Sequence, residues 1–231
     1  SAIAKLGQYK LDTRIGEGAM GTVWRAHHAM LQRPTAVKLI RSGDADEEDL
    51  ARFEREVQLT SRLTHPNTVA IYDFGRNDQG VFYYAMEYLP GITLEDLVTE
   101  VGPLEPSRVI HLLRQAAGSL AEAHDAGLIH RDVKPANLML CPRGGMHDVV
   151  KVLDFGLVKE DNAGESGLTQ RGTILGTPHY MAPEAVVSPD RIDGRADIYS
   201  LAVTLHDAFS GRAVYRRPTV DASRQAALGG H

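Results

Sequence analysis

The first part of the chain alternates apolar and polar positions in the way that is typical of β-strands. Runs rich in β-branched and aromatic residues cover 9–15, 22–26, 35–40, 69–74 and 81–88. One segment differs, because Leu50, Phe53 and Val57 follow an acidic stretch at helical spacing. The pattern predicts a small β-rich unit with one inserted helix.

From residue 90 the pattern changes to helix. Ser107 is a candidate N-cap, and apolar residues recur at helical spacing from Val109 to Ala123, before Gly127. A hairpin, a long polar loop and an apolar helix are expected to follow, over residues 138–153, 156–183 and 196–209. We therefore expect an α+β chain with a small β-rich lobe, a hinge and a larger helical lobe, an arrangement that favours a ligand between the lobes.

Composition narrows the class of protein. Of the 231 residues, 43% are hydrophobic and 24% are charged, the balance of a soluble globular protein. The net charge of −5 argues against nucleic acid as a partner. No membrane-spanning run or signal-peptide pattern is present, and the single Cys141 cannot form an internal disulfide. We expect a cytoplasmic chain; a membrane anchor beyond either end is left open.

Residues 16–23 match the pattern G-x-G-x-x-G-x-V. On its own this pattern also fits a dinucleotide-binding loop or a plain structural turn. Dinucleotide binding requires a helix directly after the glycines, whereas Thr22, Val23 and Trp24 continue as a strand. A loop between two strands instead lets backbone amides close over phosphates.

Lys38 lies within an otherwise apolar strand. A strand lysine usually extends to water, but one that points inward requires an anion such as a phosphate. The helix that follows offers Glu54 and Glu56 as carboxylate partners. We prefer Glu56, because it lies beside Phe53 and Val57, which define the inward face.

Residues 130–137 place several ionisable or polar side chains directly after an apolar pair. Asp132 can accept a hydroxyl proton, Lys134 can neutralise a phosphoryl group, and Asn137 can ligate a hard cation. Asp154 follows at the end of an apolar strand, where a carboxylate is costly unless it is hydrogen-bonded or binds a metal. Asn137 and Asp154 are therefore predicted to hold Mg²⁺, with Mn²⁺ as an alternative, against the phosphates of ATP.

In this order the motifs resemble those of the protein kinase family, from about Tyr9 to Gly211: glycine loop, strand lysine, helix glutamate, His-Arg-Asp loop, Asp-Phe-Gly and Ala-Pro-Glu. The resemblance implies a bilobal protein-kinase-like fold, with an N-lobe over 9–89 and a C-lobe over 90–211. The C-lobe is expected to be truncated, because the family's later helices have no equivalent, and residues 212–231 are expected to be a tail or loop.

The resemblance also implies an ATP site. Met86 would be the gatekeeper, and Glu87 and Leu89 would offer the hinge backbone groups that bind adenine. The residues implied in ATP binding are Ile15, Gly16, Glu17, Gly18, Ala19, Met20, Gly21, Val23, Ala36, Lys38, Met86, Glu87, Leu89 and Met139. Those implied in catalysis are Lys38, Glu56, Asp132, Lys134 and Asn137.

Further features refine the resemblance. Asp197, flanked by apolar residues, resembles the buried helix aspartate that braces the catalytic loop. Lys134 and residues 176–180 resemble serine/threonine kinases rather than tyrosine kinases, with Thr177 expected near Asp132. Residues 65–69 and 130–137 look most like the bacterial, eukaryotic-like branch. The implied partners are ATP and proteins that bear serine or threonine.

Arg131 precedes the catalytic aspartate, and in the family such an arginine marks control by phosphorylation of the activation loop. Thr169 and Thr173 are the candidate acceptors, with Ser166 behind them. Each singly is equally well explained as an ordinary polar loop residue. Thr169 is favoured by its spacing from Thr177, and self-association would let the chain phosphorylate itself.

Three hypotheses about function remain open at this point. The main one is an active serine/threonine protein kinase. A non-catalytic kinase-like module that binds nucleotide or acts as a scaffold fits the missing helices, but the presence of Lys38, Asp132, Asn137 and Asp154 speaks against it. A small-molecule kinase shares the metal chemistry, but it leaves the long loop before Glu184 unexplained.

Overall fold

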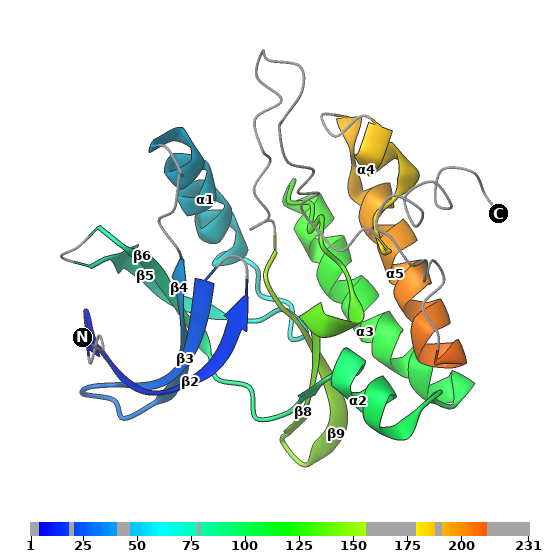
Figure 1. Cartoon of the computed structure of the whole chain (residues 1–231), viewed down its shortest axis with the longest axis horizontal. Helices are drawn as coiled ribbons and strands as arrows, with labels where there is room; N and C mark the ends of the chain where they lie inside the picture. Colours follow the sequence, from blue (N-terminus) through cyan, green and yellow to red (C-terminus); the bar gives the residue numbers. More distant parts are fainter. Residues whose placement is uncertain are drawn as a thin grey trace. The chain divides into compact units, whose positions relative to one another are not determined.

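The computed structural model describes residues 5–18, 21–40, 47–77, 80–155, 179–187 and 191–211 (Figure 1). The chain forms two compact units. The first comprises Ser1–Thr64 and Val69–Pro90, and the second comprises His65–Thr68 and Gly91–His231. The functional domain bounds 9–89 and 90–211 stay a prediction.

The first unit is built on an antiparallel sheet with the strand order β1-β2-β3-β4-β6-β5. Its strands are β1 (Lys5–Leu6), β2 (Tyr9–Gly18), β3 (Gly21–His28), β4 (Pro34–Ile40), β5 (Ile71–Arg76) and β6 (Phe82–Glu87). One face packs into a core of Leu6, Tyr9, Ala26, Val37, Tyr83 and Ala85. On the opposite face, helix α1 (Glu47–Thr60) packs Phe53, whose ring meets the Phe82 ring edge-on at 4.8 Å. The predicted β-rich unit with one helix is confirmed.

The second unit is mainly helical, with one small sheet. Its helices are α2 (Leu94–Val101), α3 (Pro106–Asp125), the 3-10 turn η1 (Pro135–Asn137), α4 (Pro183–Val187) and α5 (Gly194–Ser210). Its strands are β7 (Ile92–Thr93), β8 (Leu138–Arg143) and β9 (Met146–Val152), in that order. The apolar stripe of α3 is buried, as its spacing predicts, and α3 packs against both α5 and β9.

Strand β9 is attached to α3 and to the short segment 65–68. The side-chain nitrogen Nδ2 of Asn67 donates to the Gln115 side-chain oxygen at 2.9 Å and to the Val150 carbonyl at 2.7 Å. The Val152 N–H donates to the Asn67 carbonyl at 2.7 Å. Because β9 leads directly to Asp154, these bonds also determine where that carboxylate lies.

Some element boundaries differ from the sequence-based expectations. Ser107 is not the N-cap of α3; Glu105 occupies that position, and Pro106 begins the helix. The fixed φ of proline suits the first helical position, which moves the start of the helix before Ser107. Strand β5 begins at Ile71 rather than at residue 69. Elements β1, β7 and α2 were not expected.

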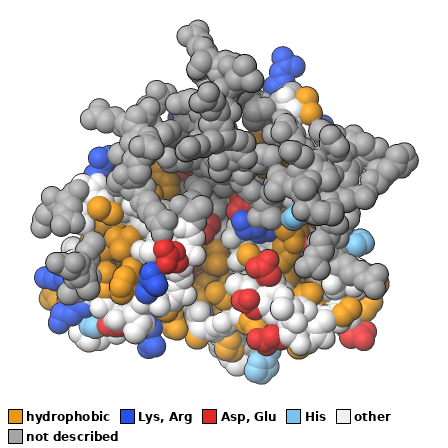
Figure 2. Space-filling view, in the orientation of Figure 1, with side chains coloured by type: hydrophobic (Ala, Val, Ile, Leu, Met, Phe, Trp, Pro, Cys, Tyr) orange, Lys and Arg blue, Asp and Glu red, His pale blue; other side chains and the backbone are white. Residues whose placement is uncertain are grey.

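The described residues on the face shown in Figure 2 carry no single dominant charge. Figure 2 shows acidic and basic side chains interspersed on the face in view, in keeping with the small net charge. Among the helices that the structure describes, none combines the length and the apolar character that crossing a membrane requires.

Candidate active site

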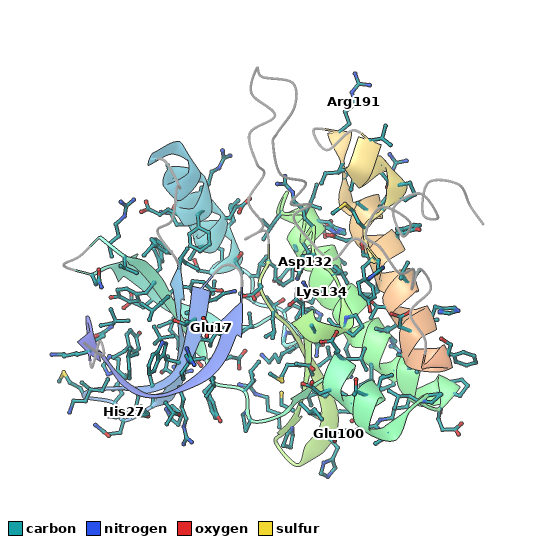
Figure 3. The ribbon with its side chains drawn as sticks, in the orientation of Figure 1. Glu17, His27, Glu100, Asp132, Lys134 and Arg191 are labelled. Atoms are coloured by element: carbon teal, nitrogen blue, oxygen red, sulfur yellow. The ribbon has the colours of Figure 1, made fainter. Side chains whose placement is uncertain are left out.

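The predicted catalytic loop lies in the second unit, between α3 and β8. Figure 3 shows Asp132 and Lys134 beside each other there. The Lys134 ammonium nitrogen lies 2.7 Å from Oδ2 of Asp132, and the Asn137 amide nitrogen donates to the same oxygen at 3.0 Å. Both Asp132 and Lys134 are mostly buried. One carboxylate is thus held by a cation and an amide, in a defined orientation.

Asn137 and Asp154 lie close together, as the magnesium prediction requires. The Leu153 N–H donates to the Asn137 carbonyl at 3.0 Å, which places Asp154 one residue from that bond. The nitrogen of the Asn137 amide faces Asp132, so its oxygen faces away from Asp132. An amide oxygen and a carboxylate are donors that suit a hard divalent cation, so this pair fits the predicted metal.

The backbone at this site is held in an unusual conformation. Asp154 has φ 54° and Arg131 has φ 67°, both in the left-handed region that non-glycine residues seldom adopt. Such conformations cost on the order of 1–3 kcal/mol and persist where the surroundings enforce them, often at functional sites.

His130 is one of the groups that enforce it. The side chain is fully buried, and its Nε2 lies 2.8 Å from the Leu153 carbonyl, while Nδ1 lies 3.2 Å from the Asp132 N–H. A carbonyl can only accept and an N–H can only donate, so His130 is neutral with its proton on Nε2. The ring also packs against Phe155, with centroids 4.7 Å apart. His130 therefore links the catalytic loop to the segment that carries Asp154.

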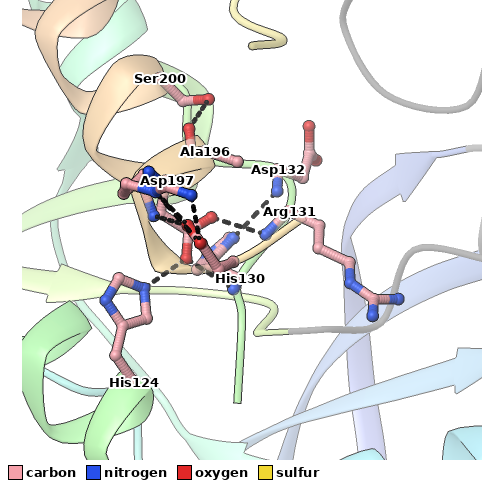
Figure 4. A network of polar contacts seen from close by, with 9 residues as sticks. His124, His130, Arg131, Asp132, Ala196, Asp197 and Ser200 are labelled. Atoms are coloured by element: carbon pink, nitrogen blue, oxygen red, sulfur yellow. Dashed lines mark hydrogen bonds and ion pairs between the residues drawn. The ribbon is translucent and has the colours of Figure 1, made fainter. Parts of the chain in front are cut away.

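Asp197 braces the other side of the loop, as the resemblance implied. Its carboxylate is 1% exposed and accepts the backbone N–H groups of His130 and Arg131, both at 2.8 Å. The Nε2 of His124 lies 2.7 Å from the same carboxylate, a contact that the sequence did not indicate. Figure 4 shows Asp197 on α5, between His124 and the loop.

Four of the residues predicted for ATP binding share one face of the sheet in the first unit: Val23, Ala36, Lys38 and Met86. Register places Val23 opposite Lys38, Lys38 opposite Tyr84, and Ala36 opposite Met86. Residues opposite each other in an antiparallel pair point to the same face. This face is the reverse of the core face that carries Val37 and Ala85. An apolar surface with one buried lysine, 6% exposed, matches a site for an apolar ring bearing phosphates.

The glycine motif forms the β2–β3 hairpin. Gly21 has φ 149°, and a Cβ there would lie 1.8 Å from the Leu39 carbonyl oxygen, so the fold itself requires glycine. At Gly18 a Cβ would meet nothing within 4 Å. The fold therefore does not require glycine at position 18. A ligand that approached the backbone closely there would require it. Ile15 lies in the bulge of β2 and is half exposed, and Glu17 lies further along the same strand.

The structure separates the two glutamates that were weighed as partners for Lys38. Glu54 accepts two bonds from Arg76, at 3.0 and 2.7 Å. Glu56 lies half-buried next to the fully buried Val57. The engagement of Glu54 with Arg76 supports Glu56, and the ion pair of Lys38 with Glu56 stays a prediction.

Glu87, in the predicted hinge, is held by two hydrogen bonds to the backbone of Ala70. Its N–H donates to the Ala70 carbonyl, and its own buried carboxylate accepts the Ala70 N–H, each at 2.9 Å. Leu89 follows at the end of the first unit. Met139 lies on β8 in the second unit, opposite Thr93.

Several predicted residues lie outside the described part of the chain: Ala19, Met20, Gly156, Ser166, Thr169, Thr173 and Thr177. Within the described part, no group of three or more His, Cys, Asp or Glu side chains could hold a metal. A metal at Asn137 and Asp154 would therefore take further oxygen ligands from phosphate and water, as Mg²⁺ commonly does.

The β-sheet with its glycine hairpin, the buried strand lysine and the braced catalytic loop define the protein kinase fold. The family model described as "Protein kinase domain" matches residues 9–229 of this chain. The chain belongs to the protein kinase family. Members of this family use ATP together with a divalent metal ion.

Similar proteins agree with this assignment. The chain is 40% identical to the serine/threonine-protein kinase pkn3 of Myxococcus xanthus, over 88% of this chain and 38% of that protein. It is 36% identical to PrkC of Bacillus subtilis (strain 168), over 89% of this chain and 31% of that protein. The resemblance to bacterial, eukaryotic-like kinases is confirmed, and the chain spans less than two fifths of these relatives' length.

A solved structure matches the same fold. The kinase domain of PknI from Mycobacterium tuberculosis, as a C20A_R136A double mutant, superposes with a TM-score of 0.74 at 29% sequence identity. The match covers 99% of this chain and 85% of that one. The predicted kinase fold is confirmed.

Proposed function

We propose that this chain transfers the γ-phosphoryl group of ATP to serine or threonine hydroxyls of proteins. The observation that carries the proposal is the arrangement of Asp132, Lys134 and Asn137, with both Lys134 and Asn137 on one oxygen of Asp132. The names of the relatives support serine/threonine specificity. Because phosphoryl transfer needs little covalent participation by the protein, positioning and charge account for most of its catalysis.

Each residue has a role that follows from its contacts. Asp132 orients the attacking hydroxyl and accepts its proton on the carboxylate that Lys134 and Asn137 hold in place. Lys134 also neutralises charge on the phosphoryl group. Lys38 binds ATP phosphates, and the apolar face that includes Val23 and Ala36 receives adenine.

Asn137 and Asp154 would hold the metal ion, which when bound neutralises phosphate charge and orients the phosphates for transfer. We favour Mg²⁺ over Mn²⁺, because the amide and carboxylate oxygens are hard donors and phosphates complete its coordination. Dependence on ATP places the proposed activity in the cytoplasm, where ATP is supplied.

A direct test compares the unaltered chain with Asp132→Asn for transfer of labelled phosphate from ATP to a generic basic protein. Asp132→Asn should lower turnover by about 10²-fold or more, the scale of general-base and positioning effects. Its affinity for ATP should stay unchanged, because Asp132 contacts the acceptor hydroxyl. Acid hydrolysis of the labelled product should release phosphoserine or phosphothreonine. Equal turnover of the two proteins contradicts the proposal.

The non-catalytic scaffold hypothesis is less well supported. A scaffold has no need for Asp132 to be held by two side chains, or for Asp154 to adopt a strained backbone conformation. Both features are explained by catalysis.

A further inference from the structure

Basic side chains lie next to one another on three neighbouring strands of the first unit's sheet. Register places Lys5 of β1 opposite Lys10 of β2, and Lys10 opposite His27 of β3. Residues that lie opposite each other in antiparallel strands point to the same face. Arg25 lies two residues before His27 on β3, so it points to that face as well. We call Lys5, Lys10, Arg25 and His27 the basic strip.

The two lysines of the strip are an unfavourable choice for the fold itself. Like charges at directly opposite positions of paired strands repel each other and destabilise the sheet. Lys5, Lys10 and Arg25 are all exposed, and none of the three forms an ion pair with any residue that the structure describes. The fold therefore does not account for this grouping of cations, whereas an anionic ligand does.

The neighbours of the strip leave most of its charge uncompensated. Nδ1 of His27 lies 3.0 and 3.2 Å from the two carboxylate oxygens of Asp12, to which it donates. The guanidinium carbon of Arg25 lies 5.2 Å from the centre of the Tyr88 ring, an uncharged partner. Three permanent cations thus face one carboxylate, and that carboxylate is bound by the imidazole.

The local excess of positive charge contrasts with the whole chain, whose net charge is −5. Figure 2 shows basic side chains around a histidine at the lower left, in the place where Figure 3 labels His27. A cluster of one sign on a chain of the opposite sign attracts oppositely charged ligands to that place in particular.

The strip is separate from the place proposed for the phosphates of ATP. It shares a sheet face with Val23 and Lys38, but it lies at the end of β2 and β3 that is remote from the glycine hairpin. Lys10 precedes Gly16 by six positions, which corresponds to about 20 Å of strand. Phosphates held by Lys38 and the hairpin therefore do not neutralise the strip.

Charge and size favour a protein segment as the ligand. Nucleic acids and anionic membranes are bound through many cations acting together, and the net negative charge of the chain opposes both. The strip is narrow, because three strands span only about 10 Å. An extended peptide presents a side chain about every 3.3 Å, so neighbouring aspartates or glutamates match this width.

We propose that the basic strip is a docking site for an acidic segment of the proteins that this chain phosphorylates, away from the place where the acceptor hydroxyl reacts. The substrate class is thereby narrowed to proteins that carry neighbouring aspartates or glutamates apart from the phosphorylated serine or threonine. The assignment to substrates rests on the proposed kinase function. The binding of an acidic segment does not depend on catalysis.

Fluorescence anisotropy with a labelled hexaglutamate peptide measures this binding directly. The unaltered chain should bind hexaglutamate, with an affinity that falls as salt is added, and should not bind hexaglutamine. Lys5→Gln combined with Lys10→Gln should weaken binding by roughly 5-fold or more, because two exposed charge pairs are lost. No binding of hexaglutamate by the unaltered chain overturns the proposal.

The matched control is Arg55→Gln combined with Arg62→Gln. Both arginines are exposed residues of the same unit and lie outside the strip, so this variant loses the same charge. It should bind hexaglutamate within about 2-fold of the unaltered chain, whereas an equal loss in the two double variants would show attraction by overall charge alone and overturn the proposal. Vesicles containing phosphatidylserine should bind neither the unaltered chain nor the control, and vesicle binding through Lys5 and Lys10 without peptide binding would assign the strip to a membrane instead.

Thermal melting separates a docking role from a structural one. Lys5→Gln combined with Lys10→Gln should melt at the same temperature as the unaltered chain or higher, because the change removes repulsion between paired strands. A lower melting temperature would show that the two lysines support the sheet, and this outcome contradicts the proposal.

Kinetics test the link to substrates. A serine peptide is joined to six glutamates, or to six glutamines, by a flexible linker of 20 glycine and serine residues, whose average reach is about 25 Å. The KM of the unaltered chain should be roughly 5-fold lower for the glutamate form, with kcat and the KM for ATP unchanged, and the two forms should be equal for the Lys5→Gln, Lys10→Gln variant. If the unaltered chain phosphorylates neither peptide, the proposed function fails, and anisotropy still decides whether the strip binds acidic segments. Equal KM values for both peptides in an active unaltered chain overturn the assignment to substrates.

Discussion

Lys38 is a buried cation, and its ammonium group therefore needs anionic partners nearby. It is 6% exposed, and its ammonium lies 6.0 Å from the centre of the Tyr84 ring. An exposed strand lysine would need no explanation, whereas a buried one implies anionic partners. The proposed partners are Glu56 and the phosphates of ATP.

A double-mutant cycle tests the first of these partners. Lys38→Ala and Glu56→Ala should each impair catalysis, and the double variant should lose much less than the sum, because both changes break one unit. Glu54→Ala is the matched control on the same helix, and it should leave turnover nearly unchanged since Glu54 binds Arg76. Turnover losses that add fully would show that Lys38 and Glu56 act separately.

At the scale of single residues, local sequence context determined what could be predicted. Asp132, Asn137 and Asp154 occur in short motifs, and a charged residue among apolar neighbours marked Asp197. His124 gave no such signal. It acts through a contact with a residue 73 positions away in the chain, which no local pattern reports.

In the glycine hairpin, the fold requires glycine at position 21, whereas only ligand binding would require it at position 18. Gly21→Ala would drive a methyl group into the Leu39 carbonyl and should destabilise the chain by roughly 1–3 kcal/mol. Gly18→Ala has room and should change stability by less than about 0.5 kcal/mol. If phosphates lie under the hairpin, Gly18→Ala should nevertheless raise the KM for ATP.

Thermal melting and ATP kinetics of the two glycine variants together check this prediction. A Gly18→Ala protein with normal stability and normal KM for ATP would show that the hairpin does not close over a ligand at that position. A stable Gly21→Ala protein would contradict the steric argument.

Helix α3 and strand β9 are joined by an ion pair that should make stability depend on pH. Two guanidinium nitrogens of Arg108 donate to the two carboxylate oxygens of Asp148, each at 2.8 Å, and Asp148 has the strained φ of 58°. The hydrogen bond from Arg108 lowers the pKa of Asp148 below its ordinary value. A lowered folded-state pKa means that the stabilisation exists above the ordinary value and is lost as pH falls through the folded one.

Asp148→Asn should therefore cost about 1 kcal/mol at neutral pH, a value kept small because Arg108 is 40% exposed. The difference from the unaltered chain should shrink as pH falls below the ordinary aspartate pKa of 3.8, and it should vanish below the lowered pKa of folded Asp148. Asp193→Asn serves as the comparison: the hydrogen bond from Arg195 also lowers the pKa of Asp193, but that pair is exposed to solvent, so its pH-dependent difference should be much smaller, and asparagine retains the N-cap of α5. Urea unfolding at a series of pH values measures both, and a pH-independent difference would contradict the assignment.

The longer elements were predictable because their periodicity extends over many residues. The buried stripe of α3 and the alternation of β3 and β4 are examples. Strands β1 and β7 have two residues each, too few to show alternation, and they exist through pairing with β2 and β8. Helix α2 did have a visible start, since Thr93 caps it and bonds Asp96, but its eight residues are short for a helical pattern.

At the scale of the whole molecule, the proposed activity depends on residues from both units. Lys38 and the glycine hairpin belong to the first, and Asp132, Asn137 and Asp154 belong to the second. The order of these motifs along the chain is by itself enough to indicate the family. The arrangement of either unit's side chains required the structure, because it arises from pairing between distant segments.

Regulation is also a property of the whole molecule. We predict that the chain phosphorylates itself in the loop before Thr177, at Thr169 or Thr173, and that Arg131 binds the added phosphate. Replacing Thr169 and Thr173 together with alanine should leave ATP binding intact and depress phosphorylation of an added substrate. A doubly substituted chain with full activity and no other phosphate in that loop would show that this control does not exist.

Intact mass spectrometry can show whether the cluster around Asp132 performs phosphoryl transfer from ATP. The chain is incubated with ATP and Mg²⁺ beside Asp132→Asn, and each mass is measured over time. The unaltered chain should gain mass in steps of one phosphoryl group, while Asp132→Asn should gain none. No gain in the unaltered chain and none in an added protein substrate, or an equal gain in both chains, would contradict it.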